Sequence, residues 1–297
     1  MHVFVTGASG WIGSAVVADL LAAGHEVTGL ARSEASAAAV EAKGAHVRRG
    51  DLDDLDSIRA GAEDADAVVH LANKHDFANP AVSNAAERAA VQTIGDALVG
   101  TDRPFLVASG VAGLAQGRSV TEDDASPFHG PGSPRGGSEN LAFEFVDHGV
   151  RTVSLRFAPS VHGPGDHGFI AILAAIAREK GVSGYPGDGT HRWAAVHRTD
   201  AARMVTLGLG KAAAGTRLHA VAEEGVPTRE IAEAIGRAFD LPVAAIPSDD
   251  VQAHFGWIGT FFALDLAATS TATQKLLGWT PSGPTLVDDL AAGAYSA

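Results

Sequence analysis

The sequence contains no cysteine, which excludes disulfide bonds, thiolate metal ligands and cysteine nucleophiles. Basic residues are also scarce, because 22 lysines and arginines stand against 35 acidic residues and give a formal net charge of −13 at pH 7. A nucleic acid or an anionic membrane needs clustered positive charge, so neither is an expected partner. No apolar run reaches the roughly 18 residues of a membrane-spanning helix, and no signal-peptide pattern precedes the first apolar run. We therefore expect a cytoplasmic protein with a small, uncharged substrate.

Short apolar runs alternate with segments of helical period in the first half of the 297-residue chain. Predicted strands cover residues 3–5, 26–30, 45–47, 67–71, 105–108 and 152–157, and predicted helices cover 12–23 and 85–98. This alternation predicts an α/β fold of the Rossmann type, a doubly wound parallel sheet with helices on both faces. Ligands of such sheets bind beyond the carboxyl ends of the strands.

The alternation weakens after residue 157, where helices are predicted at 169–179, 199–209, 228–239 and 282–292. We therefore predict a dinucleotide-binding domain over residues 1–157 and a smaller, mostly helical substrate lobe over 158–297. Some strands and helices of the second half are expected to return to the first domain. The segment 116–139 is rich in Gly, Pro, Ser and Asp and is long for a connection, which makes it a candidate mobile flap.

A glycine-rich turn near the N-terminus is the strongest functional signal. Gly7, Gly10 and Gly13 lie between a predicted strand and a predicted helix, the context that identifies a dinucleotide-binding turn. The glycines allow a tight turn, close approach to a pyrophosphate and close packing of the helix, and the helix N-terminus favours the phosphate charge. The turn is predicted to bind the cofactor through Gly7, Ser9, Gly10, Trp11, Ile12 and Gly13.

The end of the second predicted strand indicates NADP(H) rather than NAD(H). An NAD-selective site usually has a carboxylate there for the ribose 2′-hydroxyl, whereas this chain has Arg32 and Ser33. The guanidinium offers donors suited to a 2′-phosphate. Two alternatives stay open: Arg32 as an ordinary solvated residue, and Glu34 as an imperfectly placed ligand of NAD(H).

Two further strand ends complete the predicted cofactor site. Asp51 and Leu52 follow the third strand and suit the adenine edge, although Asp51 is equally consistent with a helix cap. The fourth strand closes with Leu71, Ala72 and Asn73, where backbone and small side chains pass beside the ribose.

Several motifs follow the glycine turn in a fixed order. They are Gly50-Asp51-Leu52, Val69-His70-Leu71-Ala72, Leu155-Arg156-Phe157-Ala158-Pro159-Ser160-Val161-His162-Gly163-Pro164-Gly165, Val196-His197-Arg198-Thr199-Asp200-Ala201-Ala202 and Leu276-Leu277-Gly278-Trp279-Thr280-Pro281. Taken together, they resemble the extended short-chain dehydrogenases/reductases over nearly the whole chain. The resemblance implies that Pro159, Val161 and His162 also border the cofactor.

Members of that family usually carry a catalytic serine and a Tyr-x-x-x-Lys pair, in which the ammonium lowers the pKa of the phenol. This chain departs from that pattern. Its only tyrosines are Tyr185 and Tyr295, and neither is followed four residues later by lysine. Arg135 stands at the position of the tyrosine and Glu139 at that of the lysine.

The serine position is also changed, since Gly110 occupies it and Ser109 lies one residue early. Two interpretations follow: a redox-sensing NADP-binding protein without catalysis, or an enzyme whose substrate supplies the missing groups. The chain is similar to atypical reductases that lack the pair, among them angucyclinone- and simocyclinone-type ketoreductases of aromatic polyketides. That similarity implies NADPH-dependent reduction of a small apolar ketone, which is part of a polycyclic aromatic compound or of another secondary metabolite. A hydroxyl beside the carbonyl would then share its proton with the alkoxide, and the protein would mainly position the reactants.

Three side chains are candidate catalytic groups, each with a simpler alternative. Ser109 is placed to polarise a carbonyl or to cap a strand end. Lys74 is placed to reach the substrate or the ribose, or to lie in a solvated loop. His162 is placed to donate a proton or to pack against the cofactor.

The predicted substrate pocket draws on both halves of the chain. Its candidate lining residues are Gly110, Arg135, Arg192, Trp193, Phe255, Trp257 and Phe261. The aromatic run 255–262 is consistent either with core packing or with an aromatic wall for a flat substrate. No metal is predicted, because His167 and His197 lack metal-ligand spacing.

Overall fold

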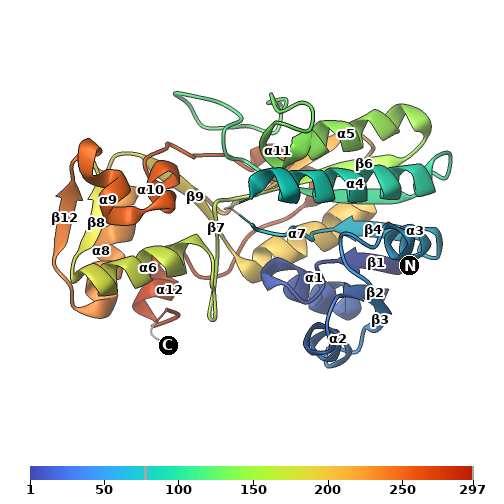
Figure 1. Ribbon diagram of the computed structural model, residues 1–297, viewed down its shortest axis with the longest axis horizontal. Coiled ribbons are helices and arrows are strands. Elements are labelled where there is room, and N and C mark those ends of the chain that lie inside the picture. Colours follow the sequence, from blue (N-terminus) through green and yellow to red (C-terminus); the bar gives the residue numbers. More distant parts are fainter. Residues whose placement is uncertain (77–78, 296–297) are drawn as a thin grey trace.

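Seven parallel strands form the centre of the computed structural model, which describes residues 1–76 and 79–295 (Figure 1). The strand order is β10-β6-β5-β4-β1-β2-β3. The strands are β1 (His2–Thr6), β2 (Glu26–Ala31), β3 (His46–Arg49), β4 (Ala67–His70), β5 (Pro104–Gly110), β6 (Arg151–Phe157) and β10 (Thr216–Ala220). The Rossmann-type fold is confirmed, and the ends of the six predicted strands shift by at most two residues. β10 was not predicted, because Arg217 and His219 interrupt its apolar pattern.

Helices cover both faces of this sheet (Figure 1). One face carries α1 (Trp11–Ala22), α2 (Glu34–Glu41), α7 (Arg198–Lys211) and α11 (Thr271–Leu277), and the other carries α3 (Leu55–Glu63), α4 (Pro80–Leu98) and α5 (Ser138–Glu144). Successive side chains of a strand point to opposite faces. In β1, Val3 and Val5 accordingly join the core under α1 and α7, whereas Phe4 joins the core under α3 and α4.

The second lobe has its own apolar core and contains more strand than predicted. One small sheet has the order β11-β9-β7 and another pairs β12 with β8. The strands are β7 (Ser160–His162), β8 (Ser183–Pro186), β9 (Arg192–His197), β11 (Glu223–Pro227) and β12 (Val243–Ile246). The helices are α6 (Phe169–Lys180), α8 (Thr228–Phe239), α9 (Val251–Phe255), α10 (Trp257–Phe262) and α12 (Leu286–Ala291), and the 3-10 turns of the chain are η1 (Pro134–Gly137), η2 (Phe145–His148) and η3 (Ser248–Asp250). Strands of three to six residues are too short to show a clear period of two.

The last helix begins later than the predicted residue 282. Thr285 caps it by accepting a hydrogen bond from the backbone N–H of Asp288, and the two residues form a capping box. The N–H groups of Ser282 and Gly283 are instead bound by the carboxylate of Asp200 on α7. The segment before α12 is therefore a loop that fastens the lobe to the large domain.

The candidate flap 116–139 is fastened near its N-terminal end. The N–H of Val120 donates to Ala267 O (2.9 Å), and the N–H of Thr269 donates to Val120 O (2.8 Å). Two residues later, Glu122 accepts hydrogen bonds from the backbone and hydroxyl of Thr273. These bonds tie the segment to the chain that leads into α11.

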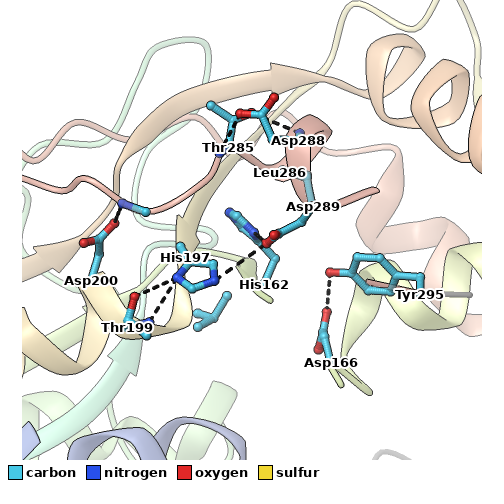
Figure 2. Close-up of polar contacts among 12 residues, drawn as sticks. His162, Asp166, His197, Thr199, Asp200, Thr285, Leu286, Asp288, Asp289 and Tyr295 are labelled. Atoms are coloured by element: carbon cyan, nitrogen blue, oxygen red, sulfur yellow. Dashed lines mark hydrogen bonds and ion pairs between the residues drawn. The ribbon is translucent and has the colours of Figure 1, made fainter. Parts of the chain in front are cut away.

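A buried polar cluster holds α12 against the rest of the lobe (Figure 2). His162 at the end of β7 is fully buried, with Nδ1 2.6 Å from Asp289 Oδ2 and Nε2 3.6 Å from Glu223 Oε2. The same oxygen of Asp289 lies 3.9 Å from His197 Nε2 at the end of β9. One carboxylate of α12 thus serves two histidines on neighbouring strands, since His162 and His197 are paired in the register of β7 and β9.

We predict that Asp289→Ala lowers the free energy of unfolding by about 3 kcal/mol, because it leaves the buried His162 without its hydrogen-bond partner. Urea denaturation of the variant measures the loss. Asp288→Ala is the matched control, since this neighbouring carboxylate is exposed and supports only the helix cap. Equal losses in the two variants would contradict the importance assigned to the buried cluster.

Candidate functional site

The candidate cofactor site lies where β1 and β4 end side by side in the sheet. After β1 the chain crosses to β2 on one side, and after β4 it crosses to β5 on the other. This is the topological switch point at which parallel α/β sheets bind their ligands. The glycine turn follows β1 and residues 71–76 follow β4, so these two predicted segments meet at one edge.

The glycine turn passes too close to neighbouring backbone for side chains to fit. Gly7 has a φ of +70°, and an added Cβ would lie 2.8 Å from Ala72 N. At Gly13 the added Cβ would lie 2.0 Å from the carbonyl oxygen of Gly7. The helix that follows has no side-chain cap at Gly10 and no acidic residue in its first turn. Its first N–H groups are therefore open to an anion, and the turn fits the pyrophosphate of a dinucleotide.

Arg32 is exposed at the end of β2. Within residues 1–76 and 79–295 its guanidinium has no hydrogen bond or ion pair. Glu34, the alternative ligand, is paired with Arg49 at 2.7 Å. Ser33 caps α2 through a capping box with Ser36. The adenosine end thus carries one uncompensated cation and a carboxylate that is already neutralised.

The loop after β3 is held together by its own carboxylates. Oδ1 of Asp51 accepts hydrogen bonds from the backbone N–H groups of Asp53 (2.8 Å) and Asp54 (3.2 Å), while Leu52 is buried in the core. The ammonium of Lys74 lies 2.7 Å from both carboxylate oxygens of Asp53. Lys74 therefore joins the loop after β4 to the loop after β3.

A hydroxyl connects β1 and β4 at the switch point. Oγ1 of Thr6 accepts hydrogen bonds from the N–H groups of Leu71 and Ala72, both at 3.2 Å, and lies 2.8 Å from Nδ1 of His70. Since the oxygen already accepts two bonds, its own hydrogen is available for Nδ1, which places the imidazole proton on Nε2. Burial, with Arg135 nearby, lowers the pKa of His70 to about 3. His70 is accordingly a neutral hydrogen-bonding group.

The lowered pKa of His70 predicts a pH dependence of stability. The unfolded chain takes up a proton at this imidazole below about pH 6.5, whereas the folded chain does so only near pH 3, so stability is lost as the pH falls between them. In His70→Asn, the side-chain oxygen keeps an acceptor for Thr6 but does not titrate. We expect the wild type to lose about 2 kcal/mol more than the variant between pH 7.5 and 4.5 in urea denaturation. Equal losses would show that His70 does not stay neutral in the fold.

Arg135 lies at the carboxyl end of β5, where the family resemblance places the nicotinamide. Its Nη2 donates to the carbonyl oxygen of Ala108 (3.1 Å) and to the carboxylate of Glu87 on α4. Ser109 follows in the strand and is half-buried. At Gly110 an added Cβ would meet no atom nearer than 3.8 Å, so space for a side chain exists at the usual serine position.

Glu87 is a site residue that the sequence did not reveal. It is fully buried and also accepts a hydrogen bond from the side chain of Asn73. Burial raises the pKa of Glu87, while Arg135 and Asn73 oppose that shift. Its one sequence signal is a glutamate among alanines on a long helix, which is equally typical of a solvated surface. The side chain of Asn73 thus supports Glu87. That the backbone and small side chains of residues 71–73 pass beside the ribose stays a prediction.

Glu139 lies away from this group although it occupies the lysine position. Its carboxylate accepts hydrogen bonds from Nε (3.1 Å) and Nη2 (2.5 Å) of Arg156, and both side chains are buried. Arg156 also donates to the carbonyl oxygen of Asp124 in the 116–139 segment. This pair joins α5 to β6 and holds the segment above the sheet, so it has a structural task.

The segment around His162 reaches the glycine turn through its backbone. The carbonyl oxygen of Val161 accepts a hydrogen bond from the indole of Trp11 at 2.7 Å. Pro159 is half-buried between β6 and β7. His162 points into the cluster with Asp289 (Figure 2), and its ring is fully buried. Of these residues, Val161 is the one in direct contact with the predicted cofactor turn.

The aromatic side chains of the predicted pocket divide into two groups. Trp193 and Phe255 lie in the lobe core, with their rings packed edge-on against Phe262 at 5.2 and 5.5 Å between centroids. Trp257 is 44% exposed and Phe261 is half-buried. The second pair is therefore accessible, while the first supports it from inside.

Phe169 at the start of α6 joins the two groups. Its ring centroid lies 5.9 Å from that of Trp193, 6.0 Å from that of Trp257 and 5.7 Å from that of Phe261. Arg192, predicted beside the pocket, is bound by Asp265, with Nη2 2.8 Å from Oδ2. The aromatic run 255–262 is thus divided: Phe255 and Phe262 pack in the core of the lobe, whereas Trp257 and Phe261 are accessible to solvent.

Across residues 1–76 and 79–295, no group of three or more His, Asp or Glu side chains is arranged to hold a metal ion. No helix in those parts is long and apolar enough to cross a bilayer.

The match to a known family covers most of the fold. A model described as the NAD dependent epimerase/dehydratase family matches residues 3–221, which include the glycine turn, the switch point and Arg135. The chain belongs to that family. The resemblance to extended short-chain dehydrogenases/reductases is confirmed at this level, and NAD(P) is the cofactor typical of the family.

Individual relatives range from close to distant. An uncharacterized protein of Schizosaccharomyces pombe is 44% identical over 296 residues, which cover 99% of this chain and 100% of that protein. A 4-hydroxy-2-methyl-3-oxo-4-farnesyl-3,4-dihydroquinoline-1-oxide ketoreductase of Stigmatella aurantiaca is 30% identical over 188 residues, or 61% of this chain and 56% of that enzyme. UDP-glucose 4-epimerase of Thermotoga maritima superposes with a TM-score of 0.76 at 19% identity, covering 100% of this chain and 98% of the other. At that identity the likeness concerns the fold alone.

Proposed function

We propose that this chain is an NADP(H)-dependent ketoreductase. Its substrate is a small apolar ketone that belongs to a polycyclic aromatic compound or to another secondary metabolite. The observation that carries the proposal is a complete dinucleotide turn with the unpaired Arg32 at its adenosine end, combined with the loss of the tyrosine and lysine at the other end. The distant similarity to a ketoreductase supports the same reaction class. When bound, the cofactor supplies a hydride to the carbonyl carbon.

The chain's tyrosines are unsuited to the usual acid–base role. Tyr295 donates a hydrogen bond to Asp166 at 2.9 Å in the lobe, and burial raises its pKa (Figure 2). Tyr185 belongs to β8, also in the lobe. Epimerases and dehydratases of this family rely on a tyrosine base, so their chemistry is a weaker choice for this chain.

The missing acid makes the substrate the best source of the proton. A hydroxyl beside the carbonyl can hydrogen-bond the developing alkoxide and share its proton, so that the protein contributes mainly orientation. The name of the Stigmatella enzyme places a hydroxy group at position 4 beside an oxo group at position 3, so that enzyme is named for a ketone with a neighbouring hydroxyl. The accessible Trp257 and Phe261 suit a flat apolar ring system.

Substrate assistance predicts a strict requirement for the neighbouring hydroxyl. With NADPH as reductant, 2′-hydroxyacetophenone, which carries a phenol beside the carbonyl, should be reduced at least about 100-fold faster than 2′-methoxyacetophenone, because methylation removes the proton donor. Initial rates of NADPH oxidation measure the ratio. Similar rates for the two ketones would rule out assistance by the substrate.

The cofactor assignment predicts a selective loss in Arg32→Ala. Removing a charge-assisted bond to the 2′-phosphate should raise the Kd of NADPH roughly 10- to 100-fold and leave that of NADH nearly unchanged. Quenching of intrinsic tryptophan fluorescence gives both constants. Arg203→Gln is a matched control, since this exposed arginine on α7 lies 3.7 Å from Asp19 and away from the turn. Equal weakening of both cofactors in Arg32→Ala would refute the 2′-phosphate contact.

A second candidate function is a redox-sensing NADP-binding protein without catalysis. The observation in its favour is the absence of all three usual catalytic groups beside an intact cofactor turn. A panel of hydroxylated aromatic ketones separates the two proposals. Tight NADPH binding without turnover on any member of the panel favours the sensor.

A further inference from the structure

We propose that the guanidinium of Arg135 stabilises the negative charge that forms on the substrate oxygen. The substrate is then one whose reduced form carries a phenolate- or enolate-type oxygen. This inference rests on the proposed ketoreductase function and specifies its substrate class. It assigns a catalytic role to Arg135 and a positioning role to Glu87.

The placement of Arg135 is suited to contact with the reacting carbonyl. Its guanidinium is bound to the carbonyl oxygen of Ala108, the residue that precedes Ser109 in β5. It therefore lies at the carboxyl edge of the sheet, one strand from the switch point between β1 and β4. The side chain is 34% exposed, so a ligand at this edge has access to it.

The backbone around Arg135 is shaped to present this side chain. Arg135, Gly136 and Gly137 have φ values of 53°, 62° and 65°, three successive residues in the left-handed region. For a residue with a Cβ this conformation costs free energy. An added Cβ at Gly136 would lie 2.7 Å from the carbonyl oxygen of Asn84, so the turn packs tightly on α4. Strain in a non-glycine residue at this position is consistent with a functional constraint.

Glu87 fixes the direction of the guanidinium. The carboxylate is fully buried behind Arg135, and both protein contacts of the guanidinium are made by Nη2. Among the residues that the structure describes, Nη1 and Nε have no partner, so their hydrogens are available to a ligand. A buried negative group behind a partly exposed cation forms a fixed dipole with its positive end toward the site. Such preorganised charge stabilises an oxyanion without reorganisation during the reaction.

A guanidinium in place of a phenol changes which products the site favours. Arginine stays protonated at any physiological pH and does not act as an acid, so it stabilises an oxyanion without neutralising it. An isolated alkoxide is about as strong a base as hydroxide, since the pKa of its conjugate acid is near that of water, and it needs a proton at once. A phenolate, with a conjugate acid of pKa about 10, persists beside a cation.

The bonds and charges of the step balance without a protein acid. The carbonyl carbon gains the hydride, the cofactor is oxidised, and the electron pair of the carbonyl π bond moves to oxygen. In a hydroxyaryl ketone the phenol proton then passes to that oxygen, and the charge remains on the phenolate beside Arg135. In a quinone the hydride adds instead to the ring carbon conjugated with the carbonyl, which forms an enolate oxygen directly, and tautomerisation of that enolate gives the hydroquinone. Solvent supplies the last proton when the product leaves.

Binding of 4-nitrophenol tests the oxyanion site without turnover. In the presence of saturating NADP⁺, Arg135 should increase the ionisation constant of the bound phenol at least about tenfold, as read from its absorbance during a pH titration. Arg135→Met should abolish this change, Arg135→Lys should keep part of it, and Arg203→Gln should keep all of it. Glu87→Gln/Arg135→Met removes both charges of the pair and covers the case in which Arg135→Met alone does not fold. Absence of an Arg135-dependent change in ionisation, including failure of the probe to bind, overturns the proposal.

A turnover assay separates this inference from the proposed function. We expect 1,4-naphthoquinone and 2′-hydroxyacetophenone to be reduced at least about 100-fold faster than cyclohexanone, whose alkoxide is strongly basic, with the advantage lost in Arg135→Met. Equal rates for naphthoquinone and cyclohexanone, or undiminished naphthoquinone reduction in Arg135→Met, overturn the inference while the reductase stands. An Arg135-dependent ionisation of 4-nitrophenol without turnover of any carbonyl compound supports the anion site and contradicts the reductase.

Discussion

The hydroxyl of Thr6 is the contact on which the geometry of the whole site depends. It binds two backbone N–H groups after β4 and the imidazole of His70, and so fixes the distance between the two strands at the switch point. That distance leaves no room for a side chain at Gly7, whose added Cβ would meet Ala72 N. The glycine turn, the start of α1 and the loop after β4 are all placed by this one junction.

Much of the fold follows from local patterns in the sequence. Most strands of the large sheet are apolar and bounded by turn residues, and the spacing of the glycines identifies the turn. Two strands were harder to predict, because β7 in the lobe has only three residues and β10 in the large sheet contains Arg217 and His219. Local patterns do not show which distant segments pair with such short or polar strands.

The sequence predicted more residues at the adenosine end of the candidate site than at the end around Arg135. The glycine turn and the exposed Arg32 lie at the strand ends where they were predicted, because cofactor binding uses backbone and charge at fixed offsets from a strand. Their contacts with NADP(H) stay a prediction. Glu87 was missed because its importance comes from burial against Arg135 and Asn73, which are 48 and 14 residues away in the sequence. Glu139 shows the opposite case. Its position matches that of the usual catalytic lysine, but its side chain is bound by Arg156 on β6, which the local sequence does not indicate.

Trp11 gives the glycine turn a second task. Its indole donates to the carbonyl oxygen of Val161 in the lobe, and Arg198 at the start of α7 lies over its ring at 4.1 Å. The residue that opens the phosphate-binding helix is therefore also part of the seam between the two lobes. A shift of this turn on dinucleotide binding would therefore reach β7 through the bond between Trp11 and Val161. We expect a compulsory order of addition, with the nucleotide first and the carbonyl compound second.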